Sequence, residues 1–426
     1  MTTAAATEMP ALAPAAAAPR RLRVLVADEA LPFPPDSGKR LRTWHLLRRL
    51  ARRHEVVLLC YGEESEAAKR ALAALGAAGI ECHMVAPPPE HSGWRLYGRL
   101  AGNCFSAWPY SVAKHHSRRF QAALEELLRR RAFDLVQVEW TPYASHLQDL
   151  PLPHVIATHN IEAQIWQRRG EISRSLAARL YFKEQARKML RFERVAFGRA
   201  QAVTAVSAQE RNEAVRLGAR NASVVANGVD LEAMQPRHGE IVRERMLFLG
   251  ALDWFANQDA VLHFAQVIFP LIRRLRPAAH LQVVGRRPPQ ALRHQLSRLD
   301  GVEMVGEVDA VQPVLAQAAV VVVPLRVGAG SRIKIVEALA MEKAVVSTRI
   351  GAEGLEVSDG EHLRLADEPG EFAAATAELL GDPDQAARLG RAGRRWVQAH
   401  HSWDDCARSL EQAWLQAAAS RKEAHP

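Results

Sequence analysis

The residues best suited to chemistry follow a run of four valines in the second half of the chain. Val320–Val323 show no polar alternation, which is typical of a strand buried on both faces of a parallel sheet. The turn that follows contains Gly328, Gly330 and Ser331, and its glycines let the backbone approach a ligand closely. A helix with Ser331 as its N-cap is expected next. Free backbone N–H groups and the positive end of the helix dipole would face this turn, so the pattern predicts an anion site.

Three side chains at the start of this predicted helix could complete a nucleotide site. Arg332 and Lys334 add cationic donors beside the turn, and Glu337 lies three residues after Lys334 on the same helix face. A carboxylate binds phosphate poorly but accepts hydrogen bonds from a ribose diol well. We therefore expect Lys334 to contact a diphosphate and Glu337 to hold the attached sugar. An ordinary turn with a solvated Lys334–Glu337 pair is the alternative that the spacing leaves open.

Length, composition and charge indicate a globular protein of two or three domains. The chain has 426 residues, of which 48% are hydrophobic and 24% charged. Its formal net charge of +9 favours an anionic partner such as a nucleotide, a phospholipid surface or nucleic acid, although a general excess of arginine would give the same value. No module that reads nucleic acid is visible, so we do not expect nucleic acid. The scattered cysteines suit a reducing cytoplasm and indicate neither a zinc site nor disulfides; they are Cys60, Cys82, Cys104 and Cys406.

No segment of the sequence is expected to cross a membrane. Residues 1–20 are rich in alanine and proline and lack the basic segment of a signal peptide, so they predict a disordered tail. No later apolar run is long enough to span a bilayer. We expect a cytoplasmic protein, soluble or peripheral on the inner face of the plasma membrane. Mixed basic and aromatic residues between Trp94 and Phe120 suit an anionic headgroup region, and a loop that packs its rings on the domain is the equal alternative.

Short apolar strands alternate with amphipathic helices along both halves of the chain. This pattern predicts an α/β protein with two Rossmann-like domains, one over 21–228 and one over 246–395, joined by a polar linker over 229–245. A last helix over 396–420 is expected to cross back to the N-terminal domain. Because ligands bind outside the carboxyl ends of parallel strands, the two domains should face each other across a cleft.

Six segments carry a resemblance to a known family when they are taken in order. They read LPFPPDSGKRLRTWHLLRRLARRHEV (31–56), FDLVQVEWTP (133–142), THNIEAQIWQRR (158–169), AVTAVSAQE (202–210), NGVDLE (227–232) and VVPLRVGAGSRIKIVEALAMEKAVVST (322–348). Together they resemble the family-4 glycosyltransferases of the two-domain GT-B fold, and most closely the PEP-CTERM/EpsH-associated exopolysaccharide sugar transferases. The resemblance implies transfer of a sugar from a nucleotide diphosphate-sugar to a glycan or lipid-linked acceptor, with retention at the anomeric carbon and without a metal or other cofactor.

The resemblance also assigns roles to single residues. Gly38 matches the glycine of the first loop, near the donor phosphates, and His159 matches a histidine near the donor sugar. Gly285 and Arg286 match the strand-end turn beside the base. Without the resemblance, the residues alone favour interpreting His159 as a hydrogen-bonded histidine at a sheet edge.

The family's E-x7-E motif is only half present. Glu337 matches its second glutamate, the ribose ligand, whereas Ala329 stands where the first would fall. Lys334 and Arg332 match the cationic phosphate contacts of the subgroup. The segment 250–259 lacks the cations common after the linker strand, so Arg332 and Lys334 are expected to neutralise the leaving diphosphate with help from Arg286.

Several polar residues keep simpler interpretations open. Glu139 could line the cleft or end a strand in solvent, and Glu162 is expected to cap the helix that follows it. Asp382-Pro383-Asp384 imitates a metal motif but precedes a helical segment, so a helix cap is expected and no metal. Two other functions stay open, namely a sugar-nucleotide 2-epimerase on the same fold and a non-catalytic sugar-nucleotide-binding protein, which the alanine at 329 would suit.

Overall fold

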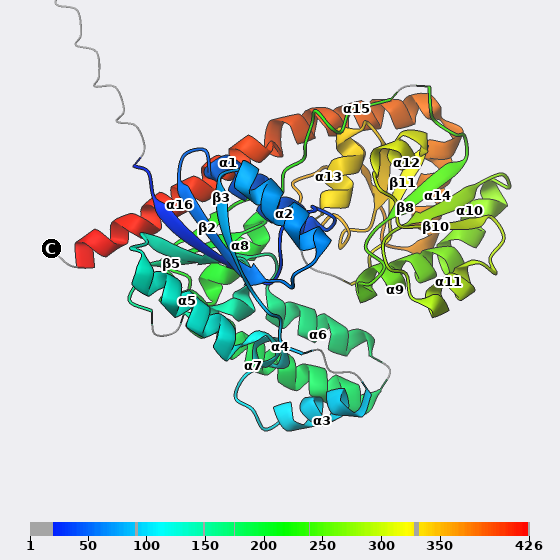
Figure 1. Cartoon of the computed structure of the whole chain (residues 1–426). Coiled ribbons are helices and arrows are strands. Elements are labelled where there is room, and N and C mark those ends of the chain that lie inside the picture. Colours follow the sequence, from blue (N-terminus) through cyan, green and yellow to red (C-terminus); the bar gives the residue numbers. More distant parts are fainter. Residues whose placement is uncertain are drawn as a thin grey trace, which may run out of the picture.

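The computed structural model describes residues 20–89, 93–147, 150–173, 175–237, 239–327 and 332–424. The first half folds around a seven-stranded parallel sheet with the order β3-β2-β1-β4-β5-β6-β7 (Figure 1). The strands are β1 (Arg23–Asp28), β2 (Glu55–Tyr61), β3 (Ile80–Val85), β4 (Leu135–Val138), β5 (His154–Thr158), β6 (Ala202–Ala205) and β7 (Ala222–Val224). The tail expected over 1–20 falls outside the described residues, except for Arg20.

Helices cover both faces of this sheet, which explains why its central strands are almost wholly apolar. Val24 and Val26 of β1 belong to the core on one face, whereas Leu25 and Ala27 belong to the core on the other. The helices are α1 (Gly38–Leu50), α2 (Glu66–Ala77), α3 (Gly93–Asn103), α4 (Tyr110–His115), α5 (Arg118–Arg130), α6 (Glu162–Ile172), α7 (Leu176–Arg199) and α8 (Ala208–Arg216). A serine hydroxyl caps the N-terminus of five of them, at Ser37, Ser65, Ser117, Ser175 and Ser207.

The second half folds around a six-stranded parallel sheet with the order β10-β9-β8-β11-β12-β13. Its strands are β8 (Arg245–Leu249), β9 (His280–Val284), β10 (Val302–Gly306), β11 (Val320–Val323), β12 (Ala344–Ser347) and β13 (Arg364–Leu365). Its helices are α9 (Phe255–His263), α10 (Phe269–Leu275), α11 (Gln290–Leu296), α12 (Gln312–Gln317), α13 (Ile333–Ala340), α14 (Pro369–Gly381) and α15 (Pro383–His400). The expected fold of two Rossmann-like domains is therefore confirmed.

The last helix, α16 (Trp403–Ala424), packs on the N-terminal domain (Figure 1). Trp403 and Trp414 are fully buried in the core that also contains Leu22 and Val24. The indole N–H of Trp414 donates to Gln137 Oε1 of β4 at 2.5 Å. This helix is thus an integral part of the N-terminal domain.

The chain passes between the domains twice, and the two crossings touch. The Val229 N–H donates to the His401 carbonyl at 2.8 Å, and His401 Nδ1 lies 2.6 Å from the Asn227 carbonyl. A Cβ on Gly228 would lie 2.6 Å from the Trp403 ring, so the close approach requires glycine there.

The predicted cap of α15 is confirmed. Asp382, the residue before this helix, accepts a hydrogen bond from the Gln385 N–H at 2.9 Å.

Candidate active site

Lys334 lies at the carboxyl end of the second sheet, on the first turn of α13. Its Nζ donates to Asn257 Oδ1 at 2.7 Å and stands 5.4 Å from the centre of the Phe248 ring. Asn257 is itself fixed, because its amide donates to the Ala251 carbonyl at 2.8 Å. The residues that follow β8 and those that follow β11 therefore converge, as the switch-point rule for parallel sheets predicts.

Lys334 and Glu337 are both half-buried in the protein. Burial lowers the pKa of Lys334 to about 7, the nearby Arg332 charge lowers it further, and Glu337 opposes the shift. Burial raises the pKa of Glu337 to about 7, and Lys334 opposes that shift. Enclosure of the two groups disfavours a solvated surface pair, and a bound anion would favour the charged form of Lys334.

Two glycines beside Lys334 are required by close packing. A Cβ on Gly285 would lie 1.9 Å from the Gly250 carbonyl oxygen, and a Cβ on Gly250 would lie 2.8 Å from Lys334 Nζ. Gly285 thus allows the turns after β8 and β9 to touch. The next residue, Arg286, ion-pairs at 3.4 Å with Asp253 and at 3.4 Å with Asp36 of the N-terminal domain.

Arg332 is committed to contacts within its own domain. Its guanidinium donates to the Ile350 carbonyl at 2.8 Å, to the Glu353 carbonyl at 3.2 Å and to Glu353 Oε2 at 3.2 Å. Its backbone occupies the N-cap position of α13, which we had expected for Ser331, and its side chain makes no capping bond. Arg332 also lines the pocket between the domains, so both predicted cations lie near the interdomain surface. The predicted site residues Gly328, Gly330 and Ser331 lie outside the described residues, as does Ala329.

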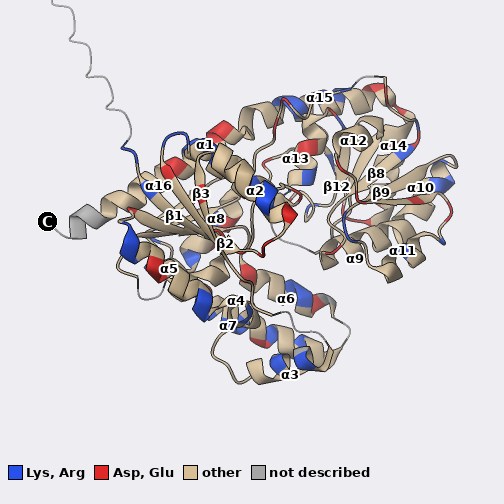
Figure 2. Ribbon diagram, in the orientation of Figure 1, with Lys and Arg blue, Asp and Glu red and all other residues tan. Residues whose placement is uncertain are grey.

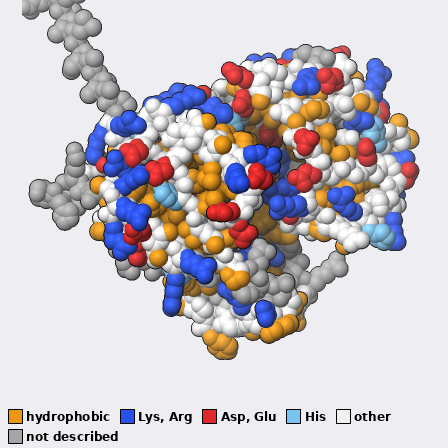
Figure 3. Space-filling view, in the orientation of Figure 1, with side chains coloured by type: hydrophobic (Ala, Val, Ile, Leu, Met, Phe, Trp, Pro, Cys, Tyr) orange, Lys and Arg blue, Asp and Glu red, His pale blue; other side chains and the backbone are white. Residues whose placement is uncertain are grey.

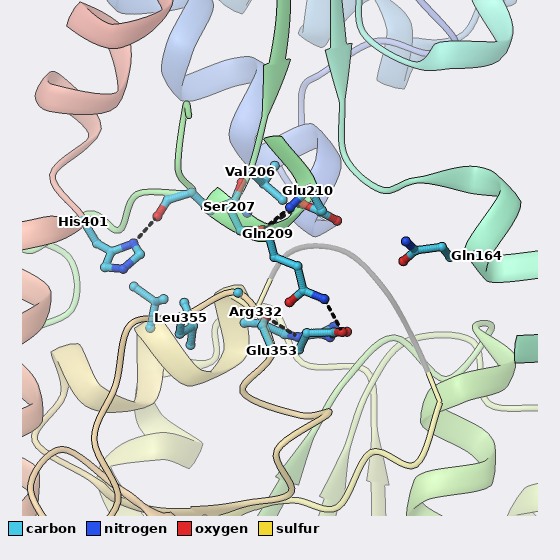
Figure 4. Close-up of a pocket in the computed structure, with 12 residues that line it drawn as sticks. Gln164, Val206, Ser207, Gln209, Glu210, Arg332, Glu353, Leu355 and His401 are labelled. Carbon is cyan, nitrogen blue, oxygen red and sulfur yellow. Dashed lines mark hydrogen bonds and ion pairs between the residues drawn. The ribbon is translucent and has the colours of Figure 1, made fainter. Parts of the chain in front are cut away.

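Glu353 joins the two domains in a pocket between them (Figure 4). Arg168 of α6 donates to both of its carboxylate oxygens at 2.9 Å, and Gln209 of α8 donates to Oε1 at 3.0 Å. Sequence analysis missed these three residues, because nothing in their local spacing relates them. The pocket is lined by Gln164, Val206, Ser207, Gln209, Glu210, Asn227, Arg332, Val336, Glu353, Gly354, Leu355 and His401.

His159 lies at the carboxyl end of β5 in the N-terminal domain and is buried. Its Nε2 lies 2.8 Å from the Glu139 carbonyl oxygen, so this nitrogen must carry the proton that it donates. Glu139 is also buried, which excludes the solvated alternative for it. Burial alone would raise the pKa of Glu139, but the contact with His159 and the charge of Arg42 outweigh it and lower that pKa.

Gly38 is the first residue of α1 and brings Lys39 to the end of β1. Lys39 Nζ ion-pairs with Asp28 at 2.6 Å and with Glu29 at 2.9 Å, and these carboxylates raise its pKa against the effect of burial. The strand ends of the N-terminal domain therefore present acidic side chains together with one lysine. Arg286 of the C-terminal domain pairs with Asp36, two residues before Gly38. The loop that leads into α1 therefore contacts the other domain.

Glu162 does not cap α6, contrary to expectation. Glu193 of α7 does so instead, because its carboxylate accepts from the Glu162 N–H at 2.7 Å and from the Ala163 N–H at 3.3 Å. The Glu162 carboxyl meets the indole N–H of Trp140 at 2.8 Å, and burial raises its pKa to about 7. Glu162 is thus a further buried acid of the N-terminal domain, and its partner is Trp140.

With this geometry in view, comparison with known proteins identifies the class. Residues 38–233 match the family model described as Glycosyltransferase Family 4, and residues 243–382 match the model described as Glycosyl transferases group 1. The two sheets with the cleft between them have the GT-B fold. The chain therefore combines a domain that matches Glycosyltransferase Family 4 with a domain that matches Glycosyl transferases group 1. A comparison with curated proteins finds no match.

Solved structures share this fold at low sequence identity. HepE from Anabaena in complex with UDP superposes with a TM-score of 0.66 at 15% identity, over 92% of this chain and 99% of its own. Sucrose-phosphate synthase from Thermosynechococcus elongatus gives a TM-score of 0.69 at 18% identity, over 93% of this chain and 100% of its own. The α,α-trehalose 6-phosphate synthase from Burkholderia multivorans gives 0.61 at 12% identity, over 94% and 100%.

Proposed function

We propose that the protein is a retaining, metal-independent glycosyltransferase that moves a hexosyl group from a nucleotide diphosphate-sugar to a glycan acceptor. The observation that carries this proposal is the enclosed pair of Lys334 and Glu337 at the carboxyl ends of β8 and β11. A cation and a carboxylate on one helix face suit a diphosphate joined to a ribose. HepE has been solved with UDP and with UDP-glucose, which supports a nucleotide-sugar donor here.

The chemical step would depend mainly on stabilising the leaving diphosphate. Lys334 is placed to neutralise its developing charge, and Glu337 would hold the ribose by accepting from its hydroxyls. The acceptor hydroxyl would attack the sugar from the same face that the diphosphate leaves, which requires both substrates to be held in line. His159 would contact the donor sugar from the opposite domain, and Gly38 would let the first loop approach the phosphates.

Arg332 and Arg286 would act by position rather than by binding phosphate directly. Arg332 fixes the loop at Ile350 and Glu353 against the start of α13, and so orients the turn that carries Lys334. Arg286 would hold the base-side turn against Asp36 of the opposite domain. This assignment leaves Lys334 as the cation that meets the diphosphate.

The acceptor would bind at the strand ends of the N-terminal domain. Asp28, Glu29 and Glu162 offer carboxyl oxygens there, which suit a hydroxyl-rich glycan. Resemblance to the PEP-CTERM/EpsH-associated subgroup supports a lipid-linked acceptor in exopolysaccharide synthesis on the cytoplasmic face of the membrane. Among the described residues, no helix is long and apolar enough to span a bilayer.

A panel of nucleotide diphosphate-sugars tests the function. Thermal shift selects the donor, and release of nucleotide diphosphate is then followed with and without a glycan acceptor. The proposal predicts release and a product with retained anomeric configuration, and NMR of that product reads the configuration directly. An isomerised nucleotide-sugar would instead identify an epimerase, and tight binding without turnover would identify a non-catalytic binding protein.

A further inference from the structure

Large apolar side chains are exposed on α3, just after it, and on the first turns of α7, at the end of the N-terminal domain. Trp94, Tyr97 and Phe105 expose 78%, 72% and 94% of their surface, and Leu176 and Leu180 expose 74% and 69%. In Figure 1 these helices form the lower end of the domain, and Figure 3 shows hydrophobic and basic side chains together there. We call these five residues the α3–α7 surface.

Buried polar bonds hold this surface in place. Lys188 of α7 donates to the carbonyls of Asn103 and Cys104 at 2.8 and 3.0 Å, and Gln185 donates to Asn103 Oδ1 at 2.8 Å. Lys188 and Gln185 are both buried, so α7 turns these polar groups inward while its apolar residues near the first turn face outward. The apolar side chains thus stay exposed in the folded protein, and exposed apolar groups of this size are typical of an interaction site.

The α3 side of the surface is basic, whereas α7 carries Glu184 one turn after Leu180, where it pairs with Arg187. Between Gly93 and Leu124 the sequence contains no aspartate or glutamate, whereas it contains Arg95, Arg99, Lys114, Arg118 and Arg119. Arg95 and Arg99 are exposed on α3, where neither makes an ion pair within the described part of the chain. Figure 2 shows the same basic character along α3. Exposed aromatic rings beside unpaired arginines suit the headgroup region of an anionic bilayer.

We infer that the α3–α7 surface docks the protein on an anionic lipid bilayer. A two-fold pair packed through α3 is the poorer occupant, because it would bring Arg95 and Arg99 of both copies together and α3 carries no acidic residue. The surface is also connected to the cleft. Arg168 of α6, the helix before α7, pairs with Glu353, and Arg169 stands 5.0 Å from the centre of the Phe255 ring in the C-terminal domain. The inference depends on the proposed function in one respect, the lipid-linked acceptor. An acceptor held in the bilayer would reach the cleft along α6.

Sedimentation with lipid vesicles tests the inference on the full-length protein. The vesicles are made of phosphatidylcholine alone or of phosphatidylcholine with phosphatidylglycerol. The wild type should sediment only with the anionic vesicles. Trp94→Ser/Phe105→Ser should weaken binding about tenfold or more, since two exposed rings no longer enter the interface. Arg95→Gln/Arg99→Gln should weaken it by about fivefold for each charge removed.

Matched controls separate this surface from general effects. Leu275→Ser removes an exposed leucine from α10 of the other domain, and Arg129→Gln/Arg130→Gln removes the same charge from α5. Both controls should bind vesicles like the wild type. Donor hydrolysis without vesicles should be unchanged in every variant, so loss of docking and failure of the proposed chemistry are read separately.

Two results would overturn docking. One is a wild type that sediments equally with neutral and anionic vesicles or with neither. The other is a concentration-dependent dimer in analytical ultracentrifugation that Trp94→Ser/Phe105→Ser abolishes, in the absence of vesicle binding. The second result would assign the surface to another copy of the chain.

Discussion

The guanidinium of Arg168 meets both carboxylate oxygens of Glu353 at 2.9 Å, and the two residues belong to different domains. Glu353 also accepts from Arg332, which directly precedes α13. One carboxylate therefore connects α6 of the N-terminal domain to the helix that carries Lys334. Burial alone would raise the pKa of Glu353, but the bonds from Arg168 and Gln209 outweigh it and lower that pKa, so the carboxylate is ionised at neutral pH.

Removing the two partners of this pair should have unequal effects on stability. Glu353→Ala leaves the buried Arg332 without its carboxylate and should cost about 3 kcal/mol. Arg168→Ala should cost about 1 kcal/mol or less, because water reaches both members of the interdomain pair. Urea denaturation of the two variants measures the difference. Equal losses would show that Arg332 does not depend on Glu353.

Lys334→Ala should reduce donor turnover by about 10²–10³-fold, since a cation that stabilises the leaving diphosphate is lost. Nucleotide diphosphate release under saturating donor measures the rate. Lys69→Ala removes an exposed lysine from α2 and should leave the rate unchanged. A normal rate for purified Lys334→Ala would remove this lysine from the mechanism.

Donor binding should be strongest near pH 7 and weaker on both sides. Above about pH 7 the free protein loses the Lys334 proton, and below about pH 7 it protonates Glu337. Isothermal calorimetry with the donor's nucleoside diphosphate, between about pH 5.5 and 8.5, measures both limbs. In Glu337→Gln the acid limb should disappear. Its alkaline limb should move to lower pH, because Glu337 normally raises the pKa of Lys334. An unchanged profile in this variant would contradict the assignment.

The two buried tryptophans of α16 provide a matched pair for one hydrogen bond. Trp414 donates to Gln137, whereas the indole N–H of Trp403 has no partner in the described structure. Both lose similar apolar contacts on replacement by phenylalanine. Trp414→Phe should therefore cost about 1–3 kcal/mol more than Trp403→Phe, since Gln137 Oε1 is left unsatisfied. Thermal denaturation compares them, and equal destabilisation would refute a role for the bond.

Local sequence was sufficient wherever the physical cause was local. The four valines at Val320–Val323 predict a buried strand, and the residues from Ile333 predict a helix; both are present as β11 and α13. Asp382 lies directly before the helix that it caps, so its role could also be predicted from nearby residues. Spacing on one helix face also placed Lys334 and Glu337 together at a strand end.

Long-range contacts were beyond the reach of such patterns. Arg168 and Glu353 are 185 residues apart, and only the packing of the two domains brings them together. Glu162 was assigned the cap that Glu193 of the next helix supplies, because a cap from a neighbouring element leaves no trace in nearby residues. The bond from Arg332 to Ile350, in the loop after β12, likewise depends on packing and could not be read from nearby residues; a contact between Arg332 and phosphate stays a prediction.

The two chain crossings that touch at Val229 and His401 also bear on how the enzyme would move. Because both connections meet at one point, we expect any hinge between the two domains to lie there. Gly228 lies next to this point, and a side chain there would meet the Trp403 ring, so we expect a substitution to disturb the crossing. If the two domains separate to exchange substrates, the ion pair between Arg168 and Glu353 would break, and it would form again when they close.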